Sequence, residues 1–355
     1  MRICVVSYHS SPLEPAGSGK SGGMNVFISH LYKTLARFCE IDIFVRGDRG
    51  HIQLGPGIRV IHINKPNFNE FAECIIDYHT TRHYDLIHTH YWLSGMIGLV
   101  TKGVLKIPWV HSLHTFEILK RIKKDQVRIE IENEIIKRCD ILISPTQKEA
   151  IVIKQMNPST RVITIPHGVD NKRFKPSADG HSTLLYVGRI DPIKGLDLLV
   201  DALRFLKREI RLNIVGGPSK GKENFESIKT YANGLPIHFL GKINYEELNK
   251  HYSKASIVIV PSYYESFGLV GLEAMASARP VIGFADTGLS ETVGRDAGIL
   301  VKRSVRNLAH AITHLFNNQG SRYTLGLKGR EKALHYEWSY IAQRYFVTYE
   351  KIIKS

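Results

Sequence analysis

The sequence predicts an α/β protein of two domains, each built on a parallel sheet with helices on both faces. Short apolar runs rich in β-branched residues alternate with helical patterns along the whole chain, which is typical of such sheets. A length of 355 residues suits two domains of ordinary size. Turn-forming residues are densest over 157–182, so we place the domain boundary at about residue 166.

The first domain, residues 1–166, begins with an apolar run that predicts a strand at 3–7. An amphipathic helix is expected next, because apolar residues recur at helical spacing at Met24, Phe27, Ile28, Leu31, Leu35 and Phe38. Further short apolar runs predict strands at 41–45, 60–63, 86–89, 109–111 and 141–144.

The second domain, residues 167–335, shows the same alternation, which we interpret as shared architecture and not as an internal repeat. Strands are predicted at 184–187, 212–215, 237–240, 257–260 and 281–284. Helices are predicted near 195–207, 223–233, 245–253 and 268–277, the last ending at Pro280. The final segment, 336–355, predicts a helix with an apolar stripe of Trp338, Ile341, Tyr345, Tyr349 and Ile352. By itself this stripe fits the last core helix of the second domain.

The composition is that of a folded protein with an excess of positive charge. A hydrophobic fraction of 43% and a charged fraction of 23% exclude disordered, collagen-like and disulfide-scaffold chains. The net charge of +15 favours an anionic partner such as nucleic acid, anionic lipid or a phosphorylated small molecule. The sequence contains no zinc-finger or aromatic RNA-binding pattern, so we expect no nucleic-acid partner.

Cysteine usage and hydropathy favour a cytoplasmic protein. The four cysteines, Cys4, Cys39, Cys74 and Cys139, lack metal-ligand spacing and predict free thiols in a reducing compartment. The first apolar run is too short for a signal peptide, and no stretch has the length of a membrane span. Peripheral attachment at the inner face of a membrane stays open, as does the choice between monomer and homodimer.

The glycine-rich stretch 17–23 has three interpretations. Its first six residues match a dinucleotide-binding pattern, with Asp42 at the spacing of a ribose-binding acid, which would suit an NAD-dependent oxidoreductase. Residues 19–21 match the end of an ATPase phosphate loop. Both patterns should follow the first strand directly, and they do not. In the third interpretation, Gly22 and Gly23 open a helix and let backbone N–H groups approach a phosphate.

Two pairs of charged residues in the second domain follow predicted strands. Arg189 and Lys194 flank the start of a helix, where two cations suit a diphosphate. Glu265 and Glu273 span a joint between strand and helix, at the edge where open α/β sheets bind ligands. Taken singly, the two cations also fit solvated surface charges, and Glu273 fits a favourable charge near a helix start.

Together these motifs resemble the retaining nucleotide-sugar glycosyltransferases of family 4, which have the GT-B fold. The resemblance extends from residue 1 to the last helix, and is nearest to the D-inositol-3-phosphate glycosyltransferases of mycothiol synthesis and to the sucrose-phosphate synthases. The matching runs are Gly22-Gly23-Met24-Asn25-Val26, His90-Tyr91-Trp92-Leu93-Ser94-Gly95, His111-Ser112-Leu113-His114-Thr115, Pro166-His167-Gly168-Val169-Asp170, Gly188-Arg189 with Lys194-Gly195, and Glu265-Ser266-Phe267-Gly268 with Glu273.

The resemblance implies two Rossmann-like domains facing across a cleft, with the acceptor on the first and a nucleotide sugar on the second. We expect this donor to be a UDP-sugar. It also implies that the helix 336–355 crosses back to the N-terminal domain. Arg189 and Lys194 would bind the diphosphate and stabilise the leaving group, so that neither a metal nor another cofactor is required. Glu265 would bind hydroxyls of the donor sugar and Glu273 those of the ribose. The other implied donor contacts are Gly22, Gly23, Phe267, Gly268, Leu269 and, on the sugar, His114.

The predicted catalytic residues are therefore His114, Arg189, Lys194 and Glu265. The sequence leaves two routes to retention open. In one, the leaving phosphate takes the acceptor proton on the front face, and in the other Glu265 acts as a nucleophile in a double displacement.

For the acceptor, resemblance to the inositol-phosphate enzymes implies phosphate ligands at Asn25, Tyr91, Thr115, Arg128 and, in poorly matching surroundings, Lys65. The basic stretch 101–128 also suits a phosphorylated small acceptor such as an inositol phosphate or a hexose phosphate. Lys120, Arg121, Lys123 and Lys124 leave open a lipid-linked or polysaccharide acceptor at a membrane surface. An NAD-dependent oxidoreductase is disfavoured, because hydride transfer needs neither of the charged pairs of the second domain.

Overall fold

The computed structural model describes residues 1–14, 22–121, 124–177, 182–207, 209–218 and 223–355. The chain divides into two compact units. The first contains Met1–Glu14, Met24–Gly168 and Trp338–Ser355, and the second contains Val169–Glu337 together with Gly22 and Gly23. Residues 17–21 of the glycine-rich stretch and Lys123 of the basic stretch lie outside the described residues.

The first unit is built on one sheet whose described strands lie in the order β3-β4-β2-β1-β5-β6-β7-β8. Neighbouring strands are parallel except β3 and β4, which form an antiparallel pair at one edge. The sequence prediction missed β3, which alternates polar and apolar residues, and β8, which has only three residues and is only partly buried. The strands are β1 (Arg2–Val6), β2 (Glu40–Arg46), β3 (His51–Gly55), β4 (Ile58–Ile63), β5 (Leu86–His90), β6 (Trp109–Ser112), β7 (Ile141–Ser144) and β8 (Val162–Thr164).

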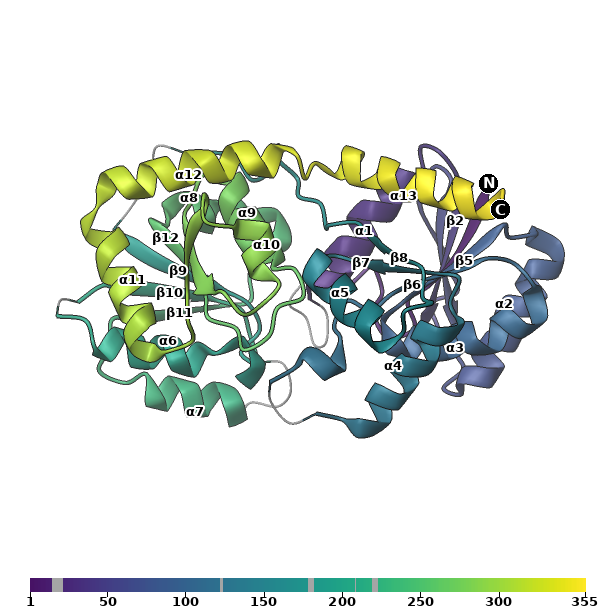
Figure 1. Ribbon diagram of the computed structural model, residues 1–355, viewed down its shortest axis with the longest axis horizontal. Helices are drawn as coiled ribbons and strands as arrows, with labels where there is room; N and C mark the ends of the chain where they lie inside the picture. The colour runs from purple at the N-terminus through teal and green to yellow at the C-terminus, as the bar shows by residue number, and fades with distance from the viewer. Residues whose placement is uncertain (15–21, 122–123, 178–181, 208, 219–222) are drawn as a thin grey trace. The chain divides into compact units, whose positions relative to one another are not determined.

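Helices cover both faces of this sheet (Figure 1). One face packs against α1 (Gly23–Leu35) and α13 (Trp338–Ile353) in a single apolar cluster. The other face packs against α2 (Phe68–Arg82), α3 (Tyr91–Leu105), α4 (Gln126–Arg138) and α5 (Gln147–Met156). A short 3-10 helix, η1 (Glu117–Leu119), precedes α4. The sheet is therefore buried on both sides, as its near-continuous apolar strands require.

The C-terminal helix α13 belongs to the first unit, where it lies beside α1 (Figure 1). The rings of Phe27 in α1 and Trp338 in α13 lie 5.8 Å apart. The whole predicted stripe is buried in the same cluster, namely Trp338, Ile341, Tyr345, Tyr349 and Ile352. This confirms the returning helix that the family resemblance implied. The alternative, a last core helix of the second domain, is wrong.

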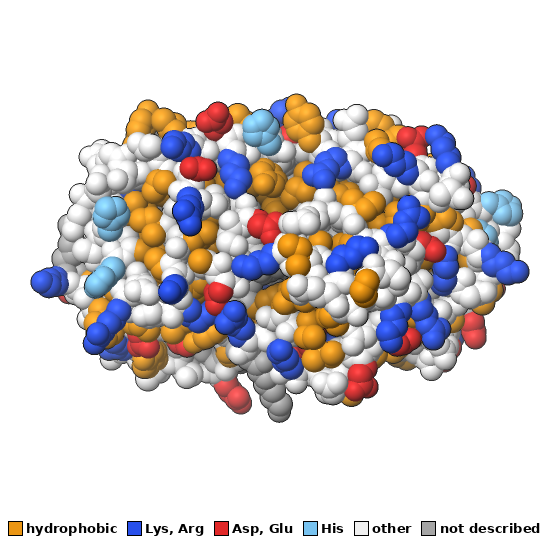
Figure 2. All heavy atoms as spheres, viewed as in Figure 1, with side chains coloured by type: hydrophobic (Ala, Val, Ile, Leu, Met, Phe, Trp, Pro, Cys, Tyr) orange, Lys and Arg blue, Asp and Glu red, His pale blue; other side chains and the backbone are white. Residues whose placement is uncertain are grey.

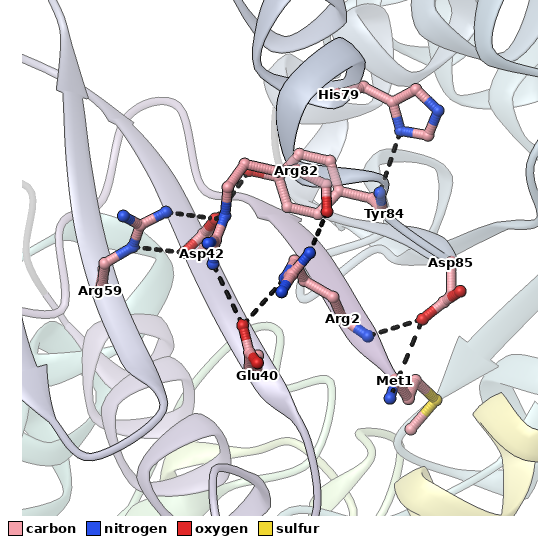
Figure 3. A network of polar contacts seen from close by, with 9 residues as sticks. All are labelled: Met1, Arg2, Glu40, Asp42, Arg59, His79, Arg82, Tyr84 and Asp85. Carbon is pink, nitrogen blue, oxygen red and sulfur yellow. Dashed lines mark hydrogen bonds and ion pairs between the residues drawn. The ribbon is translucent and has the colours of Figure 1, made fainter.

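A network of ion pairs joins the amino ends of β1 and β2 to β4 and α2 (Figure 3). Asp42 is buried and accepts hydrogen bonds from Arg59 (2.8 Å) and from the Tyr84 hydroxyl (2.8 Å). Burial alone would raise the pKa of Asp42, but these hydrogen bonds together with the charges of Arg59 and Arg82 outweigh it and lower that pKa. Asp42 thus has structural partners in the amino half of β2. A ribose-binding acid belongs at the carboxyl end, so that interpretation of Asp42 is wrong.

The second unit contains a sheet whose described strands are all parallel, in the order β11-β10-β9-β12-β13-β14. The sequence prediction found all of them except β14. They are β9 (Thr183–Val187), β10 (Arg211–Val215), β11 (Ile237–Gly241), β12 (Ile257–Val260), β13 (Val281–Phe284) and β14 (Gly298–Val301).

Helices again form a layer on each face of the second sheet. One layer contains α6 (Leu196–Arg204), α7 (Glu223–Tyr231) and α11 (Val305–Asn317). The other contains α8 (Leu248–Lys254), α9 (Leu269–Ala276), α10 (Leu289–Val293) and α12 (Gln319–Leu334). Two 3-10 helices, η2 (Pro192–Lys194) and η3 (Tyr245–Glu247), precede α6 and α8.

The strand order of each sheet reverses at its first strand. β1 lies between β2 and β5, and β9 lies between β10 and β12. In open parallel sheets, ligands bind beyond the carboxyl ends of the strands at such a reversal. The predicted donor residues of the second unit follow β9 and β12. Most of the predicted acceptor residues follow β1, β5 and β6 of the first unit.

Basic side chains are spread among acidic and apolar ones over the face shown in Figure 2. Across the part of the chain that the structure describes, no helix combines the length and apolarity needed to cross a bilayer. The same residues hold no group of three or more His, Cys, Asp or Glu side chains placed to bind a metal ion. The four cysteines are free; Cys4, Cys39 and Cys139 are buried, and Cys74 is partly exposed.

Candidate active site

The segment between β9 and α6 carries the two predicted donor cations. Arg189 is half-buried, and its guanidinium forms no hydrogen bond or ion pair with any described residue. Lys194 ends η2, and its Nζ lies 2.5 Å from Oε1 of Glu265. Gly195 has a φ of 65°, and a Cβ there would lie 2.0 Å from the carbonyl oxygen of Pro261. Glycine at this position therefore lets the segments after β9 and β12 come together.

The segment after β12 presents Glu265 to Lys194 from a position 71 residues later in the chain. The Ser262 hydroxyl donates a hydrogen bond of 2.8 Å to the same carboxylate oxygen. Both partners of the ion pair are mostly shielded from solvent. The structure thus brings together two of the predicted catalytic residues, Lys194 and Glu265. The other predicted donor cation, Arg189, forms no ion pair with a described residue.

Arg303 holds this segment in place from beyond the end of β14, and sequence reasoning missed it. Its guanidinium donates to the carbonyl oxygens of Ser262 (3.3 Å) and Tyr263 (3.0 Å) and to Asp286 Oδ1 (2.9 Å). The Gly288 N–H also donates to the carbonyl oxygen of Glu265, at 2.7 Å. These bonds fix the main chain that carries Glu265. No motif surrounds Arg303, so only the adjacency of the strands could reveal it.

Glu273 lies within α9 and is almost completely buried. The Tyr252 hydroxyl donates a hydrogen bond of 2.7 Å to Oε2 of Glu273. Burial raises the pKa of Glu273 to about 7, although hydrogen bonds from Tyr252 and Tyr245 and the charge of Arg173 act to lower it. The first turn of α9 contains no acidic residue, so the interpretation of Glu273 as a favourable charge at a helix start is wrong.

The remaining predicted donor residues lie at two helix starts. Phe267 is buried, Gly268 precedes α9 with a φ of 91°, and Leu269 is the first residue of that helix. Gly23 is the first residue of α1, directly after Gly22. The first N–H groups of a helix have no acceptor within the helix, so both starts offer donors that suit an anion.

His114 follows β6 in the first unit and is buried. Its φ of 60° is an uncommon conformation for histidine. Its Nε2 lies 2.8 Å from Nδ1 of His90, whose Nε2 lies 2.5 Å from the Tyr32 hydroxyl. Burial and the neighbouring histidines lower the pKa of both rings far below the usual range. Because a neutral imidazole donates from one nitrogen and accepts at the other, His90 links the tautomer of His114 to Tyr32.

Three of the five predicted acceptor residues meet at Arg128, near the start of α4. The guanidinium donates from NH1 to the Tyr91 hydroxyl (2.9 Å) and from NH2 to the Thr115 hydroxyl (2.7 Å). Two carboxylates also contact it, Glu132 at 2.7 Å and Glu117 at 3.0 Å. The side chain of Arg128 is only 6% exposed. The structure therefore places this predicted phosphate ligand inside a buried cluster.

The other two predicted acceptor residues lie apart from Arg128. Asn25 is buried in α1, where its amide donates to the Ser11 carbonyl at 2.7 Å and contacts Ser10 Oγ at 2.5 Å. Lys65 is half-exposed and pairs with Glu70 at 3.2 Å. Among the described residues, neither forms a hydrogen bond or ion pair with Tyr91, Thr115 or Arg128.

Two family models match adjoining parts of the chain. Glycosyltransferase Family 4 matches residues 21–173, and Glycosyl transferases group 1 matches residues 169–332. The D-inositol 3-phosphate glycosyltransferase of Kineococcus radiotolerans is 31% identical over 99% of this chain and 96% of its own length. The chain belongs to glycosyltransferase family 4. It is a nucleotide-sugar glycosyltransferase of the retaining hexosyltransferase type.

Further relatives agree with this assignment. The D-inositol 3-phosphate glycosyltransferase of Kribbella flavida is 32% identical over 98% of this chain and 95% of its own length. The structure of sucrose-phosphate synthase from Thermosynechococcus elongatus superimposes with a TM-score of 0.92 at 30% identity, covering 99% of each chain.

A second structure, Anabaena HepE in complex with UDP-glucose, has a TM-score of 0.82 at 19% identity and covers 99% of this chain and 100% of its own. At this identity it shows the shared fold alone. The GT-B fold is confirmed by these structural neighbours. The oxidoreductase and ATPase interpretations of the glycine-rich stretch are wrong.

Proposed function

We propose that this glycosyltransferase moves a hexose from a UDP-sugar to a hydroxyl of a phosphorylated small acceptor, such as an inositol phosphate or a hexose phosphate. The observation that carries the proposal is full-length similarity, at 30% and 31% identity, to a sucrose-phosphate synthase and a D-inositol 3-phosphate glycosyltransferase. The second unit binds the donor and the first unit binds the acceptor.

In the donor site, Arg189 and Lys194 bind the diphosphate. The leaving group gains negative charge in the transition state, and cations already in position lower that barrier without a metal ion. The unpaired guanidinium of Arg189 among the described residues supports this role, because a half-buried cation favours an anionic partner. The 2.5 Å contact between Lys194 and Glu265 keeps both groups in one place before the donor arrives.

The carboxylates of the second unit bind hydroxyl groups of the donor. Glu265 accepts from the transferred sugar, and Glu273 accepts from the ribose. Phe267, Gly268 and Leu269 contribute main-chain groups at the start of α9. Gly22 and Gly23 let the backbone approach the diphosphate, and His114 contributes a contact to the donor sugar.

Transfer on the front face of the sugar fits these residues. The acceptor oxygen forms the new bond to the anomeric carbon, the bond to the diphosphate breaks, and the acceptor proton passes to the leaving phosphate oxygen. Glu265 is held by Lys194 and Ser262 through one oxygen, and a carboxylate paired with a lysine is a poorer nucleophile. This pairing supports the front-face route over a double displacement.

The acceptor class can be tested with a matrix of substrates read by mass spectrometry. UDP-, GDP- and ADP-sugars are crossed with inositol phosphate, hexose phosphates, their dephosphorylated forms and lipid fractions. We expect transfer from a UDP-sugar to a phosphorylated acceptor, and much slower transfer to the dephosphorylated form. Product only in the lipid fractions would refute the proposed acceptor class, while product from a GDP- or ADP-sugar would refute the proposed donor.

A further inference from the structure

The predicted phosphate ligand Arg128 already has an anion beside it, and that anion comes from the protein. Glu117 of η1 places its Oε2 3.0 Å from NH1 of Arg128 and 2.5 Å from Nζ of Lys120. The Glu117 side chain is only 3% exposed. One carboxylate oxygen therefore lies between two cations, which is the arrangement that a phosphate oxygen would favour.

The contacts of Arg128 differ in how well they are aligned. Its bonds to Glu132, to the Tyr91 hydroxyl and to Thr115 are all hydrogen bonds of 2.7–2.9 Å. Oε2 of Glu117, in contrast, is buried and accepts no hydrogen bond of good geometry. Its attraction to the two cations is therefore electrostatic, without the directional part of a charged hydrogen bond. Oε1 of Glu117 accepts a hydrogen bond of 3.1 Å from the Asp125 N–H, so the contact that Arg128 can exchange most easily is the poorly aligned one with Oε2.

The cluster around Arg128 already contains more acidic than basic groups. Arg128 and Lys120 face Glu117 and Glu132, and Asp125 contributes a third carboxylate at the start of α4. Adding a phosphate dianion beside this set would leave excess negative charge in a buried place, which is costly. The cost falls if Glu117 leaves the cations and turns toward solvent. Lys120 is 18% exposed and lies at the outer side of the cluster, where this exchange can begin.

We propose that Glu117 determines acceptor specificity, as an internal anion that the acceptor phosphate must displace from Arg128 and Lys120. Displacement makes Lys120 a second phosphate ligand beside Arg128, Tyr91 and Thr115. A neutral acceptor forms no ion pair with the two cations, whereas a phosphate dianion pairs with both of them. This inference rests on the proposed phosphorylated acceptor, and it adds two residues that the family motifs do not mark.

The test measures binding of inorganic phosphate and of glucose 6-phosphate to the full-length chain by calorimetry, with glucose as the neutral probe. Glu117→Gln removes the competing charge and should tighten phosphate binding by about tenfold or more, with no change for glucose. Lys120→Ala should weaken phosphate binding by about tenfold, since it removes one of the two cations. Lys137→Ala is the matched control, because Lys137 is an exposed lysine of α4 outside the basic stretch 101–128, and it should bind like the wild type.

The outcomes separate the two proposals. Unchanged or weaker phosphate binding by Glu117→Gln overturns the competing-anion role. If this variant does not fold, judged by its melting temperature, Lys120→Ala decides, and wild-type phosphate binding by that variant overturns the inference. Arg128→Ala tests the acceptor site itself. Equal phosphate binding by wild type and Arg128→Ala would show that the phosphate lies elsewhere, and the proposed acceptor site would then fail together with the inference.

Discussion

Replacing Glu273 with glutamine should make the second unit more stable while weakening nucleotide binding. The carboxyl group is buried in α9 against the Tyr252 hydroxyl. Its pKa rises to about 7 from 4.5, so the folded chain holds a proton that the unfolded chain has already lost over that range. The group contributes full stability below pH 4.5, and this contribution is lost as the pH rises through about 7.

The size of the effect follows from the shift in pKa. A difference of about 2.5 pH units corresponds to at most about 3 kcal/mol, lost by the wild type above pH 7. An amide of the same shape carries no charge at any pH and avoids this loss. For a unit of this size, about 3 kcal/mol corresponds to roughly 6–12 °C in melting temperature. Above neutral pH, where Glu273 is charged, loss of this acceptor for ribose should at the same time weaken UDP binding by about tenfold or more.

Two measurements follow this change. Thermal melting of wild type and Glu273→Gln across the pH range should give similar values at acid pH and a higher value for the variant above neutral pH. Infrared difference spectra should show a protonated carboxyl band that titrates near pH 7 in the wild type and is absent in the variant. Glu226→Gln, which changes an exposed residue of α7, is the control and should melt like the wild type at every pH.

The reasoning fails if Glu273→Gln is less stable than the wild type above neutral pH. It also fails if the difference between the two proteins does not depend on pH. The first result would mean that the hydrogen bonds from Tyr252 and Tyr245 outweigh the cost of burying the charge. The second would mean that folding does not raise the pKa of Glu273.

Four further results are expected. Lys194→Ala should lower turnover by more than about tenfold, because a leaving-group cation acts mainly in the transition state. Wild-type turnover in this variant would contradict the diphosphate role of Lys194. EDTA should leave the activity of the wild type intact. Arg128→Ala should raise the acceptor KM far more for a phosphorylated acceptor than for its dephosphorylated analogue, and equal increases would indicate a structural role. Tyr345→Ala should destabilise the first unit by about 3–5 kcal/mol in urea unfolding, because it empties a core position of α13. Gly195→Ala should lower both UDP affinity and melting temperature, because its Cβ would lie 2.0 Å from the Pro261 carbonyl oxygen; unchanged affinity would mean that the two segments move apart freely.

Most of the fold could be predicted from local patterns. The buried parallel strands are short, continuous apolar runs, so β1, β2, β4 and β5 were readily found, as were their counterparts in the second unit. The antiparallel edge strand β3 alternates polar and apolar residues and carries little such signal. β8 and β14 are short and only partly buried, so the composition of each run is weak evidence for a strand.

The place of α13 could not be derived from its own stripe. An amphipathic helix requires an apolar surface to cover, and both units offer one. The family resemblance supplied the answer, and the contact between Phe27 and Trp338 confirms it. Contacts between distant segments decide such questions, because the apolar periodicity of a helix says nothing of its partner.

For the candidate site, too, the sequence determined one part and the tertiary structure another. The sequence by itself determined which residue types follow which strands: Arg189 and Lys194 after one, Glu265 and Glu273 after another, Tyr91 and His114 after others. The tertiary structure alone decided their partners. It joined Lys194 to Glu265, placed Arg303 behind them, buried Glu273 against Tyr252 and set Glu117 against Arg128. The physical reason is that burial and charge pairing depend on which side chains meet in space, and residues far apart in the chain meet only once the sheets have formed.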